Sequence, residues 1–135
     1  RADFPLLSRA LEDWIAEPRR APLVPGLAVI KRAAMDAGAL GCSLSGSGPS
    51  VFALCEGEAT AARVASAMTA AVKAQIGNSG RTVGQIGTQL HGGIGMTMEY
   101  KGGHYFKRLA IIDTMFGTAD HHLKSLARAG GLGTV

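Results

Sequence analysis

The sequence predicts an α+β fold: a short antiparallel β-hairpin covered by helices, followed by an all-helical C-terminal segment. Alternating apolar residues in 40–44 and an apolar run in 51–55 predict two strands, joined by a short loop of Gly, Ser and Pro. On both sides of this hairpin, apolar residues recur every three or four positions, the period of an amphipathic helix. Hydrophobic residues make up 47% of the 135 positions and aromatic residues only 5%, so we expect a core of Ala, Leu, Ile, Val and Met.

Two helices are expected before the hairpin. The first covers residues 4–16, is ended by Pro18, and carries an apolar stripe of Phe4, Leu7, Leu11, Trp14 and Ile15. The second covers residues 27–37 and stops at Gly38. Its inward side is expected to carry Leu27, Ile30, Ala34 and, at the margin, Met35.

After the hairpin, the chain reads as helical with two glycine-rich interruptions. An Ala-rich helix is predicted over residues 58–76, with an apolar side of Val64, Ala65, Met68, Ala71, Val72 and Ile76. Residues 77–80 should weaken it, yet the pattern resumes in 83–90, so the sequence leaves open whether one helix crosses this point. Residues 91–103 read as a loop. A helix then starts at His104, and a last one covers 119–129 with Leu123 and Leu126 inward.

Composition narrows the classes of partner. Two cysteines make no disulfide framework. With the loop centre near residues 48–49, Cys42 is expected opposite Cys55 on one hairpin face, as reduced core thiols rather than as a redox pair. No apolar stretch reaches the roughly 18 residues of a membrane span. The net charge of +4 is spread along the chain and the histidines lack ligand spacing, so we expect a cytoplasmic protein with no nucleic-acid, membrane or metal partner.

The first half carries an ordered set of short motifs. Residues 17–20 read Glu-Pro-Arg-Arg, 23–26 read Leu-Val-Pro-Gly, and 45–50 read Ser-Gly-Ser-Gly-Pro-Ser. A strand–Gly/Ser loop–strand unit presents backbone N–H groups and hydroxyls that can face an anion. In this order, over residues 1–72, the set resembles the C-terminal part of the homoserine kinases, a branch of the GHMP small-molecule kinases.

This resemblance implies a substrate site. The loop residues Ser45, Gly46, Ser47 and Gly48 would line the space between substrate and nucleotide phosphates. Arg20 would bind the amino-acid carboxylate, for which a planar guanidinium fork is suited; the alternative is a solvated loop charge. Such kinases hold ATP with a glycine-rich loop and a carboxylate–metal site in their N-terminal half, and these 135 residues contain neither.

The second half carries a different signature. Residues 89–97 read Gln-Leu-His-Gly-Gly-Ile-Gly-Met-Thr, and with 104–109 they resemble the C-terminal helices of acyl-CoA dehydrogenases, over residues 73–128. The resemblance implies that FAD of a neighbouring subunit contacts Gln89, Leu90, His91, Gly92 and Gly93, and that a second flavin-contacting turn contains Gly117, Thr118 and Asp120. Phe116 stands where many members have a glutamate base, and Phe accepts no proton. Glu99, the nearest carboxylate in the sequence, is expected at the surface.

We therefore expect a fusion of two enzyme fragments, residues 1–72 and 73–135, the latter with a frayed Gly-rich tail. The chain alone is expected to be non-catalytic and to hold no cofactor. Partner segments would add ATP with Mg²⁺ to the first half, for phosphorylation of homoserine, or FAD to the second half, which is the alternative reading as an oxidoreductase module. Apolar helix faces left open in this way should drive self-association or pack into a joint core.

Overall fold

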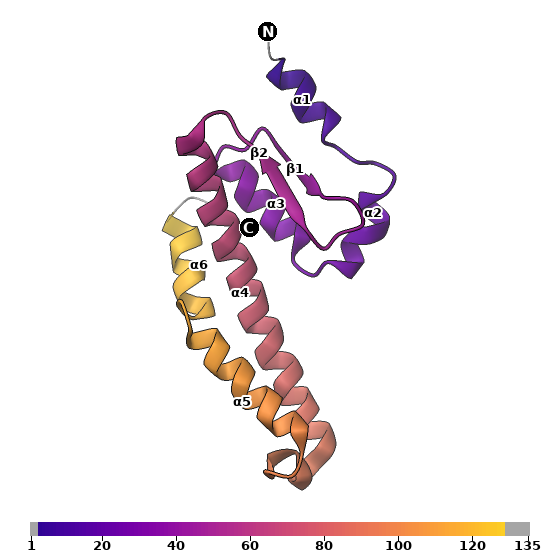
Figure 1. The fold of residues 1–135 in the computed structure, drawn as a ribbon, viewed down its shortest axis with the longest axis vertical. Helices are drawn as coiled ribbons and strands as arrows, with labels where there is room; N and C mark the ends of the chain where they lie inside the picture. The colour runs from indigo at the N-terminus through magenta and orange to yellow at the C-terminus, as the bar shows by residue number, and fades with distance from the viewer. Residues whose placement is uncertain (1–2, 129–135) are drawn as a thin grey trace. The chain divides into compact units, whose positions relative to one another are not determined.

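The computed structural model describes residues 3–128, and the chain divides into two units. The first unit joins residues 1–72 to 124–135, and the second covers residues 73–123. The longest helix, α4 (Glu58–His91), begins in the first unit and ends in the second (Figure 1). The expected frayed tail, which contains Gly130, Gly131 and Gly133, lies outside the described residues, as does residue 129 at the end of the last predicted helix.

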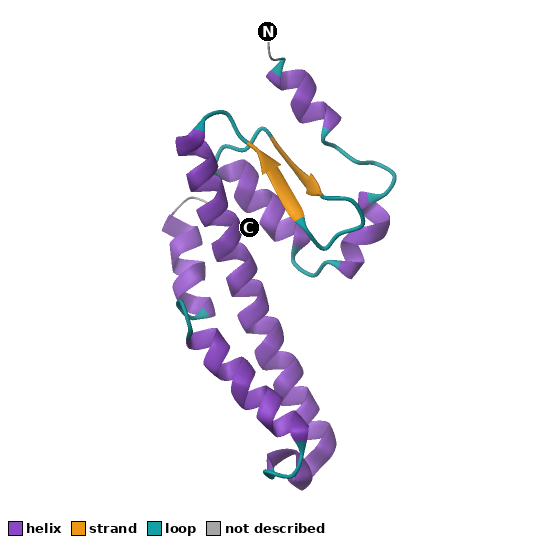
Figure 2. Cartoon of the chain, viewed as in Figure 1, coloured by secondary structure: helices purple, strands orange, loops and turns teal. Residues whose placement is uncertain are grey.

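The first unit is built on the predicted antiparallel hairpin of β1 (Gly41–Leu44) and β2 (Val51–Leu54) (Figure 2). With the helices around it, this hairpin confirms the α+β class. The expected pairing of the cysteines is wrong, because Cys42 lies opposite Ala53 rather than Cys55. The loop between the strands is shorter than expected, because the Ser45 N–H donates to the Ser50 carbonyl at 2.8 Å. Since side chains alternate along a strand, both cysteines still face the same core.

Helix α3 (Leu27–Asp36) packs against this hairpin and confirms the second predicted helix (Figure 1). Its inward residues Leu27, Ile30 and Ala34 are buried, as predicted. Met35 is 45% exposed, so its assignment to the core is wrong. The helix begins after Gly26, whose φ of 84° is a left-handed conformation that glycine adopts without strain.

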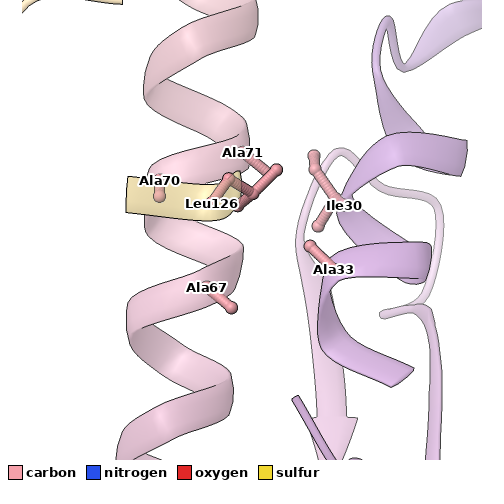
Figure 3. Packing of buried hydrophobic residues seen from close by; sticks show 6 residues of the cluster. All are labelled: Ile30, Ala33, Ala67, Ala70, Ala71 and Leu126. Carbon is pink, nitrogen blue, oxygen red and sulfur yellow. The ribbon is translucent and has the colours of Figure 1, made fainter. Parts of the chain in front are cut away.

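The core of the first unit contains fewer of the predicted apolar residues of α4, and more alanines, than the sequence predicts. The first part of α4 buries Val64 and Ala71 as expected, but Ala65 and Ile76 of the expected apolar side are exposed. The buried positions instead add Ala67 and Ala70, because small side chains let α4 approach its neighbours closely. Figure 3 shows one cluster of this core, formed by Ile30, Ala33, Ala67, Ala70, Ala71 and Leu126.

Helix α6 (Ala119–Arg128) supplies one side chain to this cluster. Leu126 is only 1% exposed, which confirms that it faces inward, whereas Leu123 is half-buried. The first unit thus takes one of its largest fully buried side chains from the end of the chain.

The first predicted helix is wrong in its length. Helix α1 covers only Phe4–Ala10, and Trp14 and Ile15 are 79% and 78% exposed. The carboxylate of Asp13 accepts the N–H groups of Ile15, Ala16 and Glu17 at 2.9, 2.8 and 3.1 Å. These hydrogen bonds lead into a new helix, α2 (Glu17–Arg20), which a 3₁₀ turn, η1 (Ala21–Leu23), follows.

In the second unit, α4 continues without a break across residues 77–80, so one helix does cross this point. Three of its glycines, Gly77, Gly80 and Gly84, lie where α5 (Lys101–Thr114) passes. A Cβ atom on Gly84 would be 2.2 Å from the Phe106 ring, and one on Gly77 would be 2.2 Å from the Asp113 carboxylate. These glycines weaken the isolated helix, but they allow the two helices to approach more closely than side chains would permit.

The predicted loop at 91–103 is shorter than expected. Residues Gly92–Met96 form a 3₁₀ turn, η2, and α5 starts at Lys101 rather than at His104. The added first turn of α5 contains Gly103, which is buried. A Cβ atom at this position would be 3.0 Å from the Gly95 carbonyl. The apolar stripe expected from His104 onwards consists of Phe106, Leu109, Ile112 and Met115. It lies in α5 as far as Ile112, but Met115 follows the end of the helix and is 48% exposed.

Within residues 3–128, no helix combines the length and the apolar character that crossing a bilayer requires.

Candidate functional site

Arg20 and the Ser45–Ser50 loop belong to different sequence motifs that are predicted to form one site, and they lie together in the first unit. Arg20 is the last residue of α2, and its Nη1 donates a hydrogen bond to the Gly46 carbonyl. The contact joins positions 26 residues apart in the chain. The sequence places both groups in one motif set, and the structure brings them into direct contact.

The loop itself is held by its own backbone. The Ser45 N–H donates to Ser50 and the Gly48 N–H donates to Ser45, at 2.8 and 3.1 Å. Gly46 and Gly48 have φ values of 59° and 81°, which L side chains rarely adopt. Ser45, Gly46 and Ser47 are exposed, so this turn presents backbone and hydroxyl groups to whatever lies beside it.

A cluster that the sequence reasoning missed lies next to this turn. The carboxylate of Glu17 forms an ion pair with Lys31 of α3, and it accepts a hydrogen bond from the Ser43 hydroxyl of β1 at 3.1 Å. The Glu17 side chain is only 15% exposed, and Ser43 is buried. Glu17 belongs to the Glu-Pro-Arg-Arg motif, but no periodicity of the sequence pairs it with residues 14 and 26 positions away.

The two cysteines are free thiols. Burial raises the pKa of the Cys42 thiol, an effect that the nearby Lys31 ammonium opposes. A raised pKa keeps Cys42 in the thiol form and makes it a poor nucleophile, which favours the core-thiol interpretation over the redox pair.

In the second unit, the residues predicted to contact a flavin lie in two separate places. The end of α4 and the start of η2 hold the exposed residues Gln89, Leu90, His91, Gly92 and Gly93. Thr118 lies at the start of α6, where its hydroxyl accepts the N–H of His121 at 3.3 Å. Helix α5, about 20 Å long from its 14 residues, runs between the two places, so the structure does not bring them together.

His91 is fixed in this region by two hydrogen bonds. Its Nδ1 lies 2.8 Å from the Gly87 carbonyl and its Nε2 lies 2.7 Å from the Tyr100 hydroxyl. The rings of His91 and Tyr100 are 4.3 Å apart between centroids. Phe116 is 88% exposed, and Glu99 is exposed as expected.

Two clefts within residues 3–128 do not coincide with either glycine-rich loop. One of about 630 Å³ in the first unit is lined by residues such as Asp36, Arg63, Ser66 and Ser125, none of them a predicted site residue. One of about 360 Å³ in the second unit contains Thr118, together with Arg81 and Asp113, which form an ion pair at 3.1 Å. Among residues 3–128, no three His, Cys, Asp or Glu side chains group as metal ligands.

Comparison with known proteins identifies the class to which the first unit belongs. The family model described as "GHMP kinases C terminal" matches residues 1–74, and the chain belongs to this family. The matched range contains both Arg20 and the Ser45–Ser50 loop.

Two curated relatives and one solved structure that the chain resembles are homoserine kinases. The homoserine kinase of Chlorobaculum tepidum is 59% identical over 69 residues, which are 51% of this chain and 21% of that protein. The homoserine kinase of Chloroherpeton thalassium is 57% identical over 68 residues, 50% of this chain and 21% of the relative. The crystal structure of homoserine kinase from Cytophaga hutchinsonii matches with a TM-score of 0.52 and 49% identity, over 53% of this chain and 23% of that one. The chain therefore spans about a fifth of the length of the relatives that it matches.

Proposed function

We propose that residues 1–72 are the C-terminal part of a homoserine kinase-type enzyme, in which Arg20 binds the carboxylate of a small amino alcohol. The observation that carries this proposal is the hydrogen bond from Arg20 to Gly46, because it joins the Arg20 guanidinium to the Ser45–Ser50 loop. The names and the identity of the relatives support the choice of homoserine.

Arg20 retains capacity for this role. A guanidinium carries five N–H donors, and the Gly46 carbonyl engages Nη1. The remaining donors suit a planar carboxylate, which accepts two parallel hydrogen bonds. In this proposal the Ser45–Ser50 loop closes the site on the side of the nucleotide phosphates, with its backbone N–H groups and hydroxyls near the transferred group.

The reaction is transfer of the γ-phosphoryl group of ATP to the substrate hydroxyl, and its nucleotide and Mg²⁺ sites would come from polypeptide outside these 135 residues. We propose accordingly that these residues alone neither bind ATP productively nor catalyse the transfer. Homoserine-dependent release of ADP by the purified chain alone would contradict this part of the proposal.

The substrate role is tested by co-expressing the chain with the preceding part of the Chlorobaculum tepidum relative. Turnover in the assembled pair, with a large loss in Arg20→Ala and a partial loss in Arg20→Lys, is the expected result, because lysine keeps the charge without the planar fork. Unchanged turnover in Arg20→Ala would reject the assignment of Arg20. Arg19→Ala, on the neighbouring exposed side chain, is the matched control.

A second candidate function concerns residues 73–128, which we propose to be an acyl-CoA dehydrogenase-type helical module joined to the kinase part as a fusion. The exposed end of α4 and the glycines of η2 favour it, because backbone without side chains can approach a dinucleotide. Quenching of FAD fluorescence by the chain, weakened in Gly93→Val, would support this function. Absence of any FAD signal at high protein concentration would count against it.

We propose further that the chain is cytoplasmic and self-associates, with no nucleic-acid or membrane partner. The second unit exposes a row of apolar side chains on α4: Ile76, Val83, Ile86 and Leu90. Their spacing of seven, three and four residues is the seam of a helix pair, and a second copy of the same helix supplies a matching seam. The unpaired cysteines fit a reducing compartment.

A further inference from the structure

Helix α2, which carries Arg20, is too short to hold its own position. It has four residues, fewer than the dozen or so that an isolated helix needs for even marginal stability. Its orientation, and with it the direction of the Arg20 guanidinium, must therefore come from contacts with the rest of the first unit.

Asp13 fixes the beginning of α2. Its carboxylate accepts the three N–H groups that precede and open the helix, those of Ile15, Ala16 and Glu17. This cap determines where the helix starts. It leaves open which face of the helix turns towards the hairpin, because the cap lies at the helix end.

Glu17 determines that face. One carboxylate oxygen pairs with Lys31 of α3 and the other accepts the Ser43 hydroxyl of β1, so the side chain ties α2 to both of the elements beside it. At 15% exposure the Glu17 carboxylate is screened by solvent much less than a surface ion pair is. Removing it would leave Lys31 and the buried Ser43 without this partner.

Glu17 and Arg20 act on the same stretch of the hairpin. They are three residues apart on α2 and so lie on one face of the helix. Their partners Ser43 and Gly46 are also three residues apart, along β1 and into the loop that follows it. The two side chains thus hold α2 against the hairpin at two successive points.

We propose that Glu17 is the positioning residue of the substrate site: it holds the Arg20 guanidinium against the Ser45–Ser50 loop in the orientation that receives a carboxylate. This inference rests on the proposed function, in which Arg20 is the carboxylate-binding group. Glu17 itself contacts no substrate, because both of its oxygens are directed at the protein.

The first test observes Arg20 without requiring any activity. In ¹⁵N-labelled full chain, the side-chain N–H signals of Arg20 are compared among wild type, Glu17→Gln and Glu12→Gln. Glu12 is an exposed carboxylate five residues earlier and serves as the matched control. We expect Glu17→Gln to shift the Arg20 signals and speed their exchange with water, and Glu12→Gln to leave them unchanged. Arg20 signals that stay the same in Glu17→Gln would overturn the proposal.

The second test uses the assembled pair described above. Glu17→Gln is expected to raise KM for homoserine on the order of ten- to hundredfold, with a smaller effect on KM for ATP, since displacement of a binding group by about 1 Å has effects of this size. Glu17→Asp, which keeps the charge, should recover part of the loss. Equal changes in both KM values would indicate general loosening of the fold and overturn the positioning role.

The outcomes separate the two proposals. If Arg20→Ala leaves KM for homoserine unchanged, the proposed function of Arg20 fails whatever Glu17 does. If Arg20→Ala raises KM and Glu17→Gln does not, only the positioning role fails. Should Glu17→Gln not fold, Ser43→Ala takes its place, because it removes one of the two contacts and keeps the Lys31 ion pair; an unchanged KM for homoserine in Ser43→Ala would then overturn the proposal.

Discussion

At the scale of single residues, the second unit depends on positions that have no side chain. Gly84 lies on α4 against the ring of Phe106, whereas Gly87, three residues further along the same helix, has no atom within 4 Å of the place where a Cβ would stand. The two glycines have the same intrinsic helix propensity and differ in what surrounds them. They therefore separate the effect of packing from the effect of propensity.

Gly84→Ala is expected to destabilise the chain and Gly87→Ala to stabilise it. An alanine in an open helix position gains about 0.5–1 kcal/mol over glycine. At position 84 the added methyl group would be 2.2 Å from Phe106, and such overpacking costs about 1–3 kcal/mol, which outweighs the gain. Thermal unfolding of both variants measures the difference. Stabilisation by both would mean that α5 does not lie against Gly84.

The carboxylate of Asp13 makes a pH-dependent contribution to folding. Hydrogen bonds from the N–H groups of Ala16 and Ile15, in that order of size, lower its pKa below the ordinary value of 3.8. A carboxyl group whose pKa is lower in the folded state stabilises the fold above the unfolded pKa, and this contribution is lost as pH falls through the folded pKa. The contribution is therefore present at neutral pH and starts to be lost as pH falls below about 4.

Asp13→Asn is expected to flatten the dependence of stability on pH in this acidic range. Asparagine retains an oxygen that can accept the N–H groups of α2, so the difference in stability between Asp13→Asn and wild type should narrow as pH falls towards 3. Melting temperatures measured between pH 3 and pH 7 give the comparison. Glu12→Gln removes one carboxylate from the same segment and keeps these hydrogen bonds. An equal flattening in that control would assign the effect to overall charge.

At the scale of elements, periodicity predicts the helices and strands well where one face is buried along the whole element. Helix α3 is the clearest case, because its predicted inward residues Leu27, Ile30 and Ala34 are all buried. The prediction fails where a hydrogen bond overrides the pattern. Trp14 and Ile15 continue the spacing of α1, but the carboxylate of Asp13 captures the backbone there and starts a new helix.

The candidate site likewise has a part that the sequence predicts and a part that it does not. Arg20 and the Ser45–Ser50 loop belong to motifs and are visible in the sequence, whereas the contact between them and the Glu17 cluster depends on how α2 lies against the hairpin. The predicted pairing placed Cys42 opposite Cys55, whereas its partner is Ala53. The hydrogen bond between Ser45 and Ser50 sets this pairing, and nothing in the sequence beyond the glycines indicates it. Contacts between elements distant in sequence are the part that a single sequence leaves out.

Helix α6 contributes to the first unit through Leu126, and this contribution is open to measurement. Leu126 is 1% exposed in the cluster with Ile30, Ala33, Ala67, Ala70 and Ala71. Leu126→Ala is expected to cost about 2–5 kcal/mol, the range for deleting a buried leucine side chain. Leu123→Ala, on the same helix but half-buried, should cost clearly less. Urea unfolding measures both, and equal losses would show that Leu126 is not the packed residue.

At the scale of the whole molecule, the chain combines a family domain with a helical unit, and it spans about a fifth of the relatives that it matches. In the second unit, α5 packs on the glycine face of α4, which holds Gly77 and Gly84. The apolar row of Ile76, Val83, Ile86 and Leu90 lies on another side of α4, since successive residues are 100° apart, and it is exposed. Such a row is unfavourable in water unless a partner covers it.

We expect replacement of this row by charge to reduce self-association. The double variant Val83→Glu/Ile86→Glu places two carboxylates in the seam that a second copy would share, where like charges would face one another without water. Asn78→Glu/Gln85→Glu adds the same charge at exposed positions well away from the row, and serves as the matched control. Light scattering across a range of protein concentrations should give a monomer mass for the seam variant and a larger mass for wild type and control. A wild-type chain of monomer mass at all concentrations would refute self-association, and a larger mass retained by the seam variant would move the interface elsewhere.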